Sequence, residues 1–368
     1  MKKNILKNME WSILICSVIL LAIGMVALFS ATQNANYDEL KKQILWFGIS
    51  IPVMIIVILI NYNLLARFSY IFYIIFIGLL IGVLFTEPIN GATSWYTISS
   101  FTFQPAEFAK IFVIIFLAYV ITLFQQKGKE QINKIWKLGT ILLVTIIPVL
   151  LIIKQPDYGT AIAYLIATVL ILYAAGINKK YIIGAIIVVV ITLPLLYFFV
   201  LPEHAKTRIQ VFFDPYEDPR GAGYNVLQSK LAIGAGKVFG MGLLQGNQTQ
   251  LGYLYPKTTD FIFSVIGEEM GFIVAGAVIV LYVILITKSI QVAKTAKDDL
   301  GSYIAIGITG IFIFHMVENI GMTMGLLPIT GVPLPFVSYG GSSLLTNFIC
   351  IGLLLNISSR RQKTIFMQ

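Results

Sequence analysis

The sequence has 368 residues, of which 58% are hydrophobic and 12% are charged, and its formal net charge is +9. Soluble domains carry about 25% charged residues, so this composition excludes an ordinary soluble protein and predicts an all-α polytopic membrane protein. The positive charge does not call for a nucleic-acid partner, because Lys and Arg gather in the cytoplasmic loops of membrane proteins.

Ten apolar runs are long enough to cross a bilayer. The predicted spans cover residues 11–31, 43–61, 67–86, 106–124, 138–153, 158–175, 181–200, 261–287, 302–325 and 341–357. The run at 138–153 is the shortest and contains Pro148. No linker or low-complexity tract divides the chain, so residues 1–368 are expected to form one integral-membrane domain.

The positions of Lys and Arg set the orientation, because these residues are enriched in cytoplasmic loops. With both termini in the cytoplasm, 16 of the 26 Lys and Arg residues face that side. They are Lys2, Lys3, Lys7, Arg67, Lys127, Lys129, Lys134, Lys137, Lys179, Lys180, Lys288, Lys294, Lys297, Arg360, Arg361 and Lys363. The outer connections are then 87–105, 154–157, 201–260 and 326–340, and the unusual polar motifs lie in or beside them. We therefore expect an active site on the extracellular face of the cell membrane.

Two short motifs open predicted helices at this outer face. Glu107 and Lys110 are three residues apart and so share one helix face; a structural ion pair and a functional role are both open. Gln155, Pro156 and Asp157 precede the sixth span, where a carboxylate is favoured at the positive end of a helix. An N-terminal cap is the simpler interpretation of Asp157.

The stretch from Asn319 to Ser343 holds three prolines and repeated glycines but no charge. Such irregular backbone must pack against protein, because lipid leaves its polar groups unpaired. Its end, from Gly340 to Ser343, could offer N–H groups to a phosphate, or the whole stretch could be a structural re-entrant loop. In the preceding span, His315 and Glu318 are too few for a zinc site, so we expect a structural hydrogen bond there.

The long polar stretch at residues 201–260 ends at Asp260, just before apolar character resumes. Asp260 could simply cap the next helix, which is a common role for Asp. The cations expected within its reach are Lys257, Arg220, Lys230 and Lys237. A carboxylate that acts as a base, near cations or a metal that hold phosphates, fits transfer from a phosphate-linked donor.

Together these motifs resemble the SEDS family (shape, elongation, division, sporulation), and the resemblance covers essentially the whole chain. It rests on residues 104–110, 155–157, 221–229, 259–269 and 319–343. The stretch Gln248-Thr249-Gln250-Leu251 looks more like the elongation branch, RodA, than the division branch, FtsW. The resemblance implies a peptidoglycan glycosyltransferase that polymerises lipid II at the outer face of the cytoplasmic membrane and releases undecaprenyl diphosphate, for cell elongation and shape.

The resemblance also implies residue roles. The essential aspartate of the family corresponds to Asp260, which is expected to be catalytic and to bind a divalent cation, Mg or Mn. The residues expected to bind substrate are Glu107, Lys110, Asp157, Arg220, Gln228, Ser229, Lys257, Ser338 and Ser342. The expected partners are lipid II and a class B penicillin-binding protein, the transpeptidase that crosslinks the glycan.

The chain departs from the family pattern in three places. Lys257 and Thr258 stand where a His often precedes the Thr-Asp pair, so a His base is not available. Thr93 and Ser94 replace a frequent Arg or Lys, and Asn225 stands where Gln is common. These departures leave the fine substrate contacts and the paralogue open.

Three functions are consistent with these residues. As an enzyme, Asp260 would deprotonate the acceptor hydroxyl or help bind a cation, and Lys110 would steady the leaving diphosphate. A flippase for lipid-linked precursors would place its ionisable residues near the bilayer midplane, whereas here they cluster at the outer edge. A scaffold that only holds a transpeptidase would tolerate charge-neutral changes at Glu107, Lys110 and Asp260.

Overall fold

The computed structural model describes residues 8–89, 91–98, 101–199 and 201–361. Four of the cations expected in the cytoplasm, Lys2, Lys3, Lys7 and Lys363, lie outside the described residues. So does position 200, where the seventh predicted span ends.

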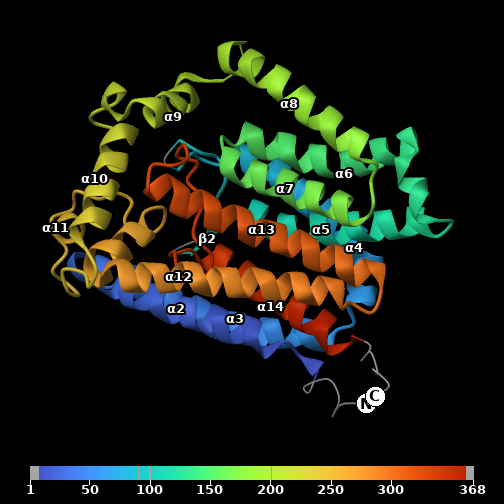
Figure 1. Ribbon diagram of the computed structural model, residues 1–368, viewed down its shortest axis with the longest axis horizontal. Coiled ribbons are helices and arrows are strands. Elements are labelled where there is room, and N and C mark those ends of the chain that lie inside the picture. The colour runs from blue at the N-terminus through green and yellow to red at the C-terminus, as the bar shows by residue number, and fades with distance from the viewer. Residues whose placement is uncertain (1–7, 90, 99–100, 200, 362–368) are drawn as a thin grey trace.

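Long helices make up most of the described structure (Figure 1). Nine of the described helices are long and apolar enough to cross a membrane, and α7 is a shorter apolar helix. These ten are α2 (Trp11–Ala31), α3 (Asp38–Leu59), α4 (Tyr62–Gly82), α5 (Pro105–Gln125), α6 (Ile135–Lys154), α7 (Tyr158–Ala174), α8 (Lys179–Phe199), α12 (Ile262–Lys294), α13 (Asp299–Thr323) and α14 (Gly341–Ser359). The predicted all-α polytopic fold is confirmed.

The other elements are short and lie between these helices. They are η1 (Gln33–Ala35), η2 (Val83–Phe85), β1 (Tyr96–Ile98), β2 (Phe101–Phe103), η3 (Lys129–Asn133), α9 (Glu203–Phe213), η4 (Pro215–Glu217), α10 (Ala222–Ala235) and α11 (Asn247–Gln250). The strands β1 and β2 pair antiparallel, with Tyr96 opposite Phe103. Residues 201–260, called the outer segment below, are therefore largely helical rather than an extended polar loop.

Some predicted boundaries differ from the structure. Helix α3 begins at Asp38 rather than at position 43, because Asp38 and Glu39 place negative charge in its first turn, where the helix dipole favours it. Helix α12 continues to Lys294, beyond the predicted end at 287. Helix α6 runs through Pro148 without ending there.

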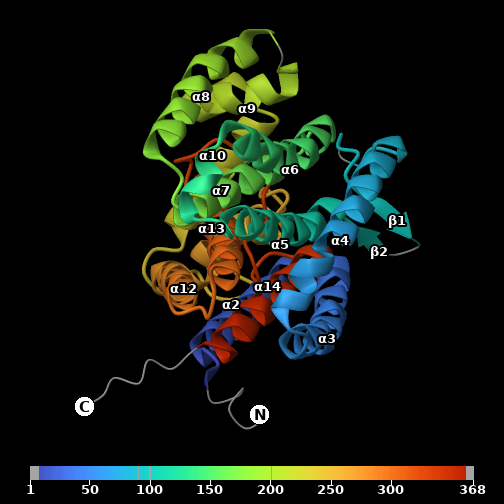
Figure 2. The same cartoon turned by 90° about the vertical axis from the view of Figure 1, so that its right-hand side faces the viewer.

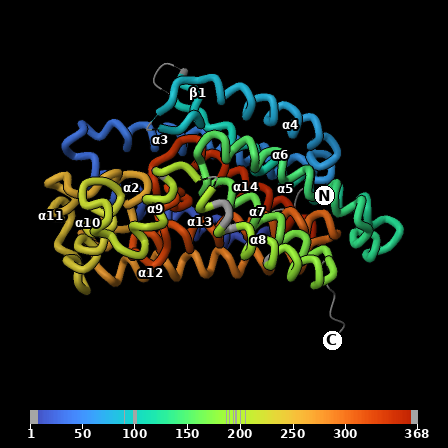
Figure 3. The backbone as a smooth tube through the Cα atoms, turned by 90° about the horizontal axis from the view of Figure 1, so that it is seen from above, coloured from blue at the N-terminus to red at the C-terminus, as the bar shows by residue number. Residues whose placement is uncertain are grey.

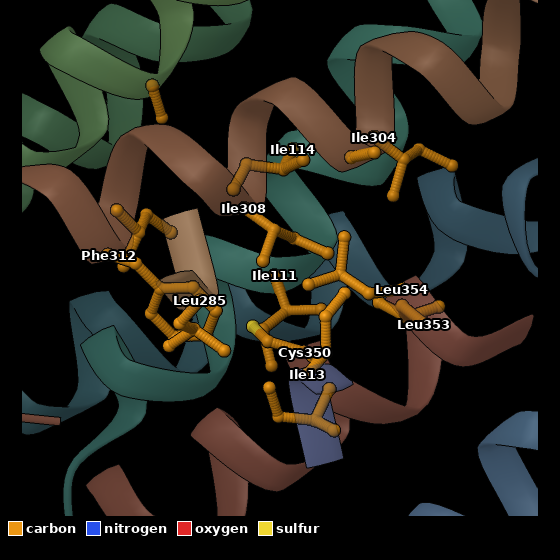
Figure 4. Packing of buried hydrophobic residues seen from close by; sticks show 14 of the residues in the cluster. Ile13, Ile111, Ile114, Leu285, Ile304, Ile308, Phe312, Cys350, Leu353 and Leu354 are labelled. Carbon is orange, nitrogen blue, oxygen red and sulfur yellow. The ribbon is translucent and has the colours of Figure 1, made fainter. Parts of the chain in front are cut away.

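Helices α13 and α14 lie at the centre of the bundle, as the view in Figure 3 shows. Of their most apolar windows, 72% and 78% of the residues are buried, against 17% for α3 and α4. The labelled residues of the central cluster in Figure 4 come from α2, α5, α12, α13 and α14; they include Ile13, Ile111, Leu285, Ile308 and Cys350. The stretch from Asn319 to Ser343 therefore starts and ends in the two most buried of these helices.

The outer segment gathers at one end of the bundle. Helices α10 and α11 lie there (Figures 1 and 3), and α8 and α9 lie on the far side of the molecule from α2 and α3 (Figure 2). We call this the outer end, because the orientation predicted from Lys and Arg places residues 201–260 outside the cell.

Close main-chain contacts hold the outer segment against α12. The helix is interrupted at Gly271, whose φ of 76° is readily adopted only by glycine. A Cβ on Gly271 would lie 2.2 Å from the Gly240 nitrogen, and a Cβ on Gly240 would lie 2.2 Å from the Glu269 carbonyl oxygen. The Phe272 N–H donates to the Lys237 carbonyl oxygen at 2.9 Å. Only glycine permits so close an approach of the two backbones.

Candidate active site

The segment between α13 and α14, residues 324–340, brings two acidic residues together at the outer end. A Cβ on Gly331 would lie 3.5 Å from Asp260 Oδ2, and a Cβ on Gly159 would lie 3.2 Å from Thr330 Oγ1. Gly159 is in the first turn of α7, two residues after Asp157. The α13–α14 segment therefore passes between the helix ends that carry Asp260 and Asp157.

Asp260 precedes α12 but does not cap it. The N-cap position is Phe261, and no side chain bonds to the first N–H groups of this helix. The Asp260 carbonyl oxygen accepts a hydrogen bond from Asn319 Nδ2 at 3.0 Å, and Ser338 Oγ donates to the Thr259 carbonyl oxygen at 2.6 Å. The main chain around Asp260 is thus fixed, while the residue itself is half-buried. The capping interpretation of Asp260 was wrong.

Asp157, in contrast, is a helix cap, as the sequence indicated. Its Oδ1 accepts from the Thr160 N–H at 3.1 Å, and its Oδ2 accepts from Gln104 Nε2 at 3.0 Å. Gln104 precedes α5, so the same carboxylate also connects the starts of α7 and α5. The sequence motifs at residues 104–110 and 155–157 therefore meet in space.

Burial raises the pKa of both carboxyl groups above its ordinary value. For Asp260, burial is the largest cause; the negative charge of Asp157 acts in the same direction, while a hydrogen bond from Thr259 and the charge of Arg208 oppose it. For Asp157, burial is again the largest cause, and the hydrogen bonds from Thr160 oppose it. A carboxylate with a raised pKa is a stronger base.

Glu107 and Lys110 form the predicted ion pair, deep in the bundle. Lys110 Nζ lies 2.8 Å from Glu107 Oε2, and their side chains are 1% and 2% exposed. Glu107 Oε2 also accepts a hydrogen bond from Thr346 Oγ1 of α14 at 3.2 Å. Lys110 is therefore enclosed and paired in this structure, and the pair positions α5 against α14.

Arg208 of α9 is a site residue that the sequence reasoning missed. It lines a pocket with Lys230 of α10 and with Gly325, Leu327 and Pro328 of the α13–α14 segment. Its charge also acts on Asp260. In the sequence it is one of six cations of the outer segment, and no local pattern separates it from the others.

The four cations expected near Asp260 have different surroundings. Lys230 shares the pocket with Arg208. Lys257 Nζ donates to the Thr249 carbonyl oxygen at 2.7 Å, and burial lowers the pKa of Lys257. Arg220 and Lys237 are exposed. The expectation that all four surround Asp260 was therefore too broad, because the outer segment folds into separate helices.

Three serines expected to bind substrate make hydrogen bonds within the protein. Ser229 is fully buried and donates to the Thr323 carbonyl oxygen at 2.6 Å. The Leu334 N–H donates to Ser338 Oγ at 2.8 Å, and Ser342 Oγ accepts from the Gln104 N–H at 3.2 Å. Gln228 is half-buried on α10. The serines hold the site together, and contact with substrate stays a prediction.

His315 and Glu318 make structural hydrogen bonds, but not with each other. His315 Nδ1 lies 3.0 Å from the Pro333 carbonyl oxygen, and Glu318 Oε1 accepts from Thr330 Oγ1 at 2.8 Å. Both partners belong to the α13–α14 segment. The two side chains of α13 thus fix the course of the proline-rich backbone that passes Asp260.

A second acidic pair lies farther along α12. Glu268 Oε1 accepts from the Gln248 N–H at 2.7 Å, and its Oε2 accepts from the Thr249 N–H at 2.9 Å and from Thr249 Oγ1 at 2.6 Å. Glu269 Oε1 accepts from Gln250 Nε2 at 2.8 Å. This pair therefore anchors α11 to α12, and Gln248 to Gln250 have a structural role.

The donor atoms available for a metal are few. Within the described parts of the chain, no group of three or more His, Cys, Asp or Glu side chains could hold a metal ion. Magnesium is often bound by one or two carboxylates together with waters and substrate phosphates. Asp260, with Asp157 near it, fits a cation of that kind and does not fit zinc.

Residues 10–363 match a family of proteins described as cell cycle protein, FtsW/RodA/SpoVE. The chain is 35% identical to a probable peptidoglycan glycosyltransferase FtsW of Trichlorobacter lovleyi, over 94% of this chain and 92% of the relative. It is 31% identical to the peptidoglycan glycosyltransferase RodA of Treponema pallidum, over 96% and 98%. It is 32% identical to the peptidoglycan glycosyltransferase MrdB of Escherichia coli, over 96% and 95%. The relatives carry both FtsW and RodA names.

Solved structures share the fold. One chain, from work on how a peptidoglycan synthase complex coordinates polymerization and crosslinking, superposes with a TM-score of 0.82 at 25% identity, over 96% of this chain and 99% of that chain. The rod shape determining protein RodA of Thermus thermophilus gives a TM-score of 0.72 at 24% identity, over 96% and 98%. The ten-helix architecture is therefore shared across distant sequences.

Proposed function

The chain belongs to the FtsW/RodA/SpoVE family and is a multi-pass membrane peptidoglycan glycosyltransferase, and we propose that it polymerises lipid II into glycan strands at the outer face of the cytoplasmic membrane. One observation carries the choice of site. Asp260 is half-buried at the outer end, and burial and a second carboxylate raise its pKa, which suits a general base.

In the proposed reaction, Asp260 is the general base. Its carboxylate takes the proton of the acceptor sugar hydroxyl, and the hydroxyl oxygen attacks the anomeric carbon of the donor. The bond between that carbon and the lipid diphosphate breaks, and its electron pair leaves with the diphosphate. Asp157 favours the proton on Asp260, because two nearby negative charges repel each other.

A divalent cation is part of this proposal. Asp260 and Asp157 are the carboxylates that would hold it, together with substrate oxygens and water. Such a cation would supply positive charge to the leaving diphosphate.

We further propose that the protein serves cell elongation with a class B penicillin-binding protein as its partner. The stretch from Gln248 to Leu251 supports the elongation branch, and its hydrogen bonds to Glu268 and Glu269 give it a fixed structural role. Depletion in cells tests this assignment: round cells indicate a role in elongation, and filaments indicate a role in division.

The decisive experiment compares the wild-type protein with Asp260→Asn in a lipid II polymerisation assay. We expect the purified variant to lose at least about 100-fold in rate, because general base catalysis contributes on that order. Its abundance and unfolding temperature should match the wild type. Normal polymerisation by the variant would refute the proposal, and transport of lipid II without polymer would favour a flippase.

A further inference from the structure

A pocket at the outer end combines two cations with apolar walls. Arg208 comes from α9 and Lys230 from α10, and the opposite wall is the α13–α14 segment from Gly325 to Ile329. Phe212 of α9 adds exposed apolar surface, and Val211 is buried in the pocket wall. Two positive charges on apolar walls suit a ligand with a strongly anionic group and an apolar part.

Lys230 is exposed, and its side chain lies at the Gly325 end of this pocket. A Cβ on Gly325 would lie 2.0 Å from Lys230 Cε and 2.5 Å from its Nζ. The lysine side chain therefore lies directly across Gly325, where φ is +68°. A residue larger than glycine at this position would displace the ammonium group.

The pocket adjoins the catalytic carboxylate through one short piece of backbone. The wall ends at Ile329, and two residues later Gly331 lies beside Asp260 Oδ2. Arg208 is close enough to Asp260 for its charge to act on that carboxyl group. An anionic group in the pocket would thus lie beside the proposed base.

We propose that Arg208 and Lys230 bind the diphosphate of the lipid-linked substrate, with the start of its hydrocarbon chain against Phe212. This inference rests on the proposed function, because the reaction requires a leaving diphosphate next to the base. Two cations offer several N–H donors to the diphosphate oxygens, and charge-assisted hydrogen bonds of this kind are strong. The sequence suggested that Lys110 would contact the leaving diphosphate, but Lys110 is buried against Glu107. The proposal assigns this contact to Arg208 instead.

A structural role for Lys230 makes a different prediction. The Lys230 side chain extends from α10 to Gly325, just beyond the carboxyl end of α13, where a cation stabilises the helix dipole. If this were its sole role, Lys230→Met would lower the unfolding temperature and leave ligand binding unchanged.

The test measures binding of farnesyl diphosphate and of inorganic diphosphate to the full-length protein in detergent. We expect Arg208→Gln and Lys230→Met each to weaken farnesyl diphosphate binding by about tenfold. Arg208→Lys should bind with intermediate affinity, because it keeps the charge but loses the planar donor set. Lys206→Met is the matched control. Lys206 is on α9 like Arg208, and its Nζ pairs with Glu203 at 3.0 Å. It should change affinity by less than about twofold.

Gly325→Ala gives a second variant that keeps both cations. It should weaken binding as much as Lys230→Met does, and combining the two should add little, because both act on one ammonium group. Thermal unfolding of each variant shows whether the fold is intact. Equal affinities of the wild type, Arg208→Gln and Lys230→Met would overturn the inference.

Two further measurements separate related outcomes. Farnesyl diphosphate should bind more tightly than inorganic diphosphate, since the hydrocarbon adds apolar contact; equal affinities would overturn the lipid-linked assignment. Asp260→Asn should still bind farnesyl diphosphate while losing polymerisation. If Asp260→Asn polymerises normally, the proposed function fails, whereas unchanged binding in the pocket variants refutes only the diphosphate site.

Discussion

Two acidic residues, Asp260 just before α12 and Glu268 within it, differ in how their oxygen atoms are used. Glu268 is fully buried, and both of its oxygens accept hydrogen bonds from the backbone or side chain of α11. Asp260 is half-buried; Asn319 and Ser338 bond to the main chain around it, and the neighbouring Thr259 donates to its carboxylate. Glu268 thus holds the fold with both oxygens, whereas the Asp260 carboxylate keeps capacity for further hydrogen bonds.

The buried Glu107–Lys110 pair gives the largest expected effect on stability. Lys110→Met should destabilise the protein by about 3–5 kcal/mol, because it leaves an unpaired charge at a buried site. The double variant Glu107→Gln, Lys110→Met should recover most of that loss. Unfolding in detergent measures both changes, and an equal loss in the single and double variants would show that the pair is not coupled.

The difference between Glu268 and Asp260 gives the next largest effect on stability. Glu268→Gln should cost about 2–3 kcal/mol, because an amide group replaces an oxygen that faces N–H and O–H donors. Asp260→Asn should change stability by less than about 0.5 kcal/mol, as substitutions outside a bonded network do. Unfolding midpoints under one condition allow the comparison. Similar losses of stability at Glu268 and Asp260 would show that both side chains hold the fold.

The smallest effect is a pair of opposite shifts in the pH profile of polymerisation. The rate falls as pH drops through the raised pKa of Asp260, because the protonated carboxyl cannot act as a base. Arg208→Gln removes a charge that lowers this pKa, so the acid limb should move to higher pH. Asp157→Asn removes a charge that raises it and can still cap α7, so the limb should move to lower pH.

Each shift should be on the order of one pH unit or less. The measurement is kcat/KM for lipid II across the acid limb, which reports the free enzyme. Lys206→Gln is the control for a loss of positive charge on α9 and should leave the profile unchanged. Shifts in the same direction for Arg208→Gln and Asp157→Asn would contradict the arrangement of charges around Asp260.

The spans and the outer acids could be predicted from the sequence for simple reasons. Apolar runs near twenty residues mark membrane helices, and Asp157 and Asp260 stand where a polar stretch meets such a run. The ends of helices were less predictable. Charged first turns such as that of α3, which holds Asp38 and Glu39, count against a span in a hydropathy reading although they favour a helix.

Arg208 and the serines show what the sequence could not provide. The place of Arg208 depends on α9 folding against the α13–α14 segment, which is more than a hundred residues away in the chain. Ser229 and Ser338 lie in polar motifs, but a motif gives the same signal whether a hydroxyl faces a ligand or a neighbouring carbonyl group. Only the packing of the helices distinguishes these cases.

The glycine joint between α12 and the outer segment affects how the sequence can vary. The contact at Gly240 and Gly271 is made by main chain, while the adjacent Val238 and Phe239 are 50% and 81% exposed. Selection for a working protein should therefore return only glycine at the two joint positions and accept many residues at the two exposed ones. Lineages can thus remodel this surface for different neighbours without changing how the outer segment is joined to α12.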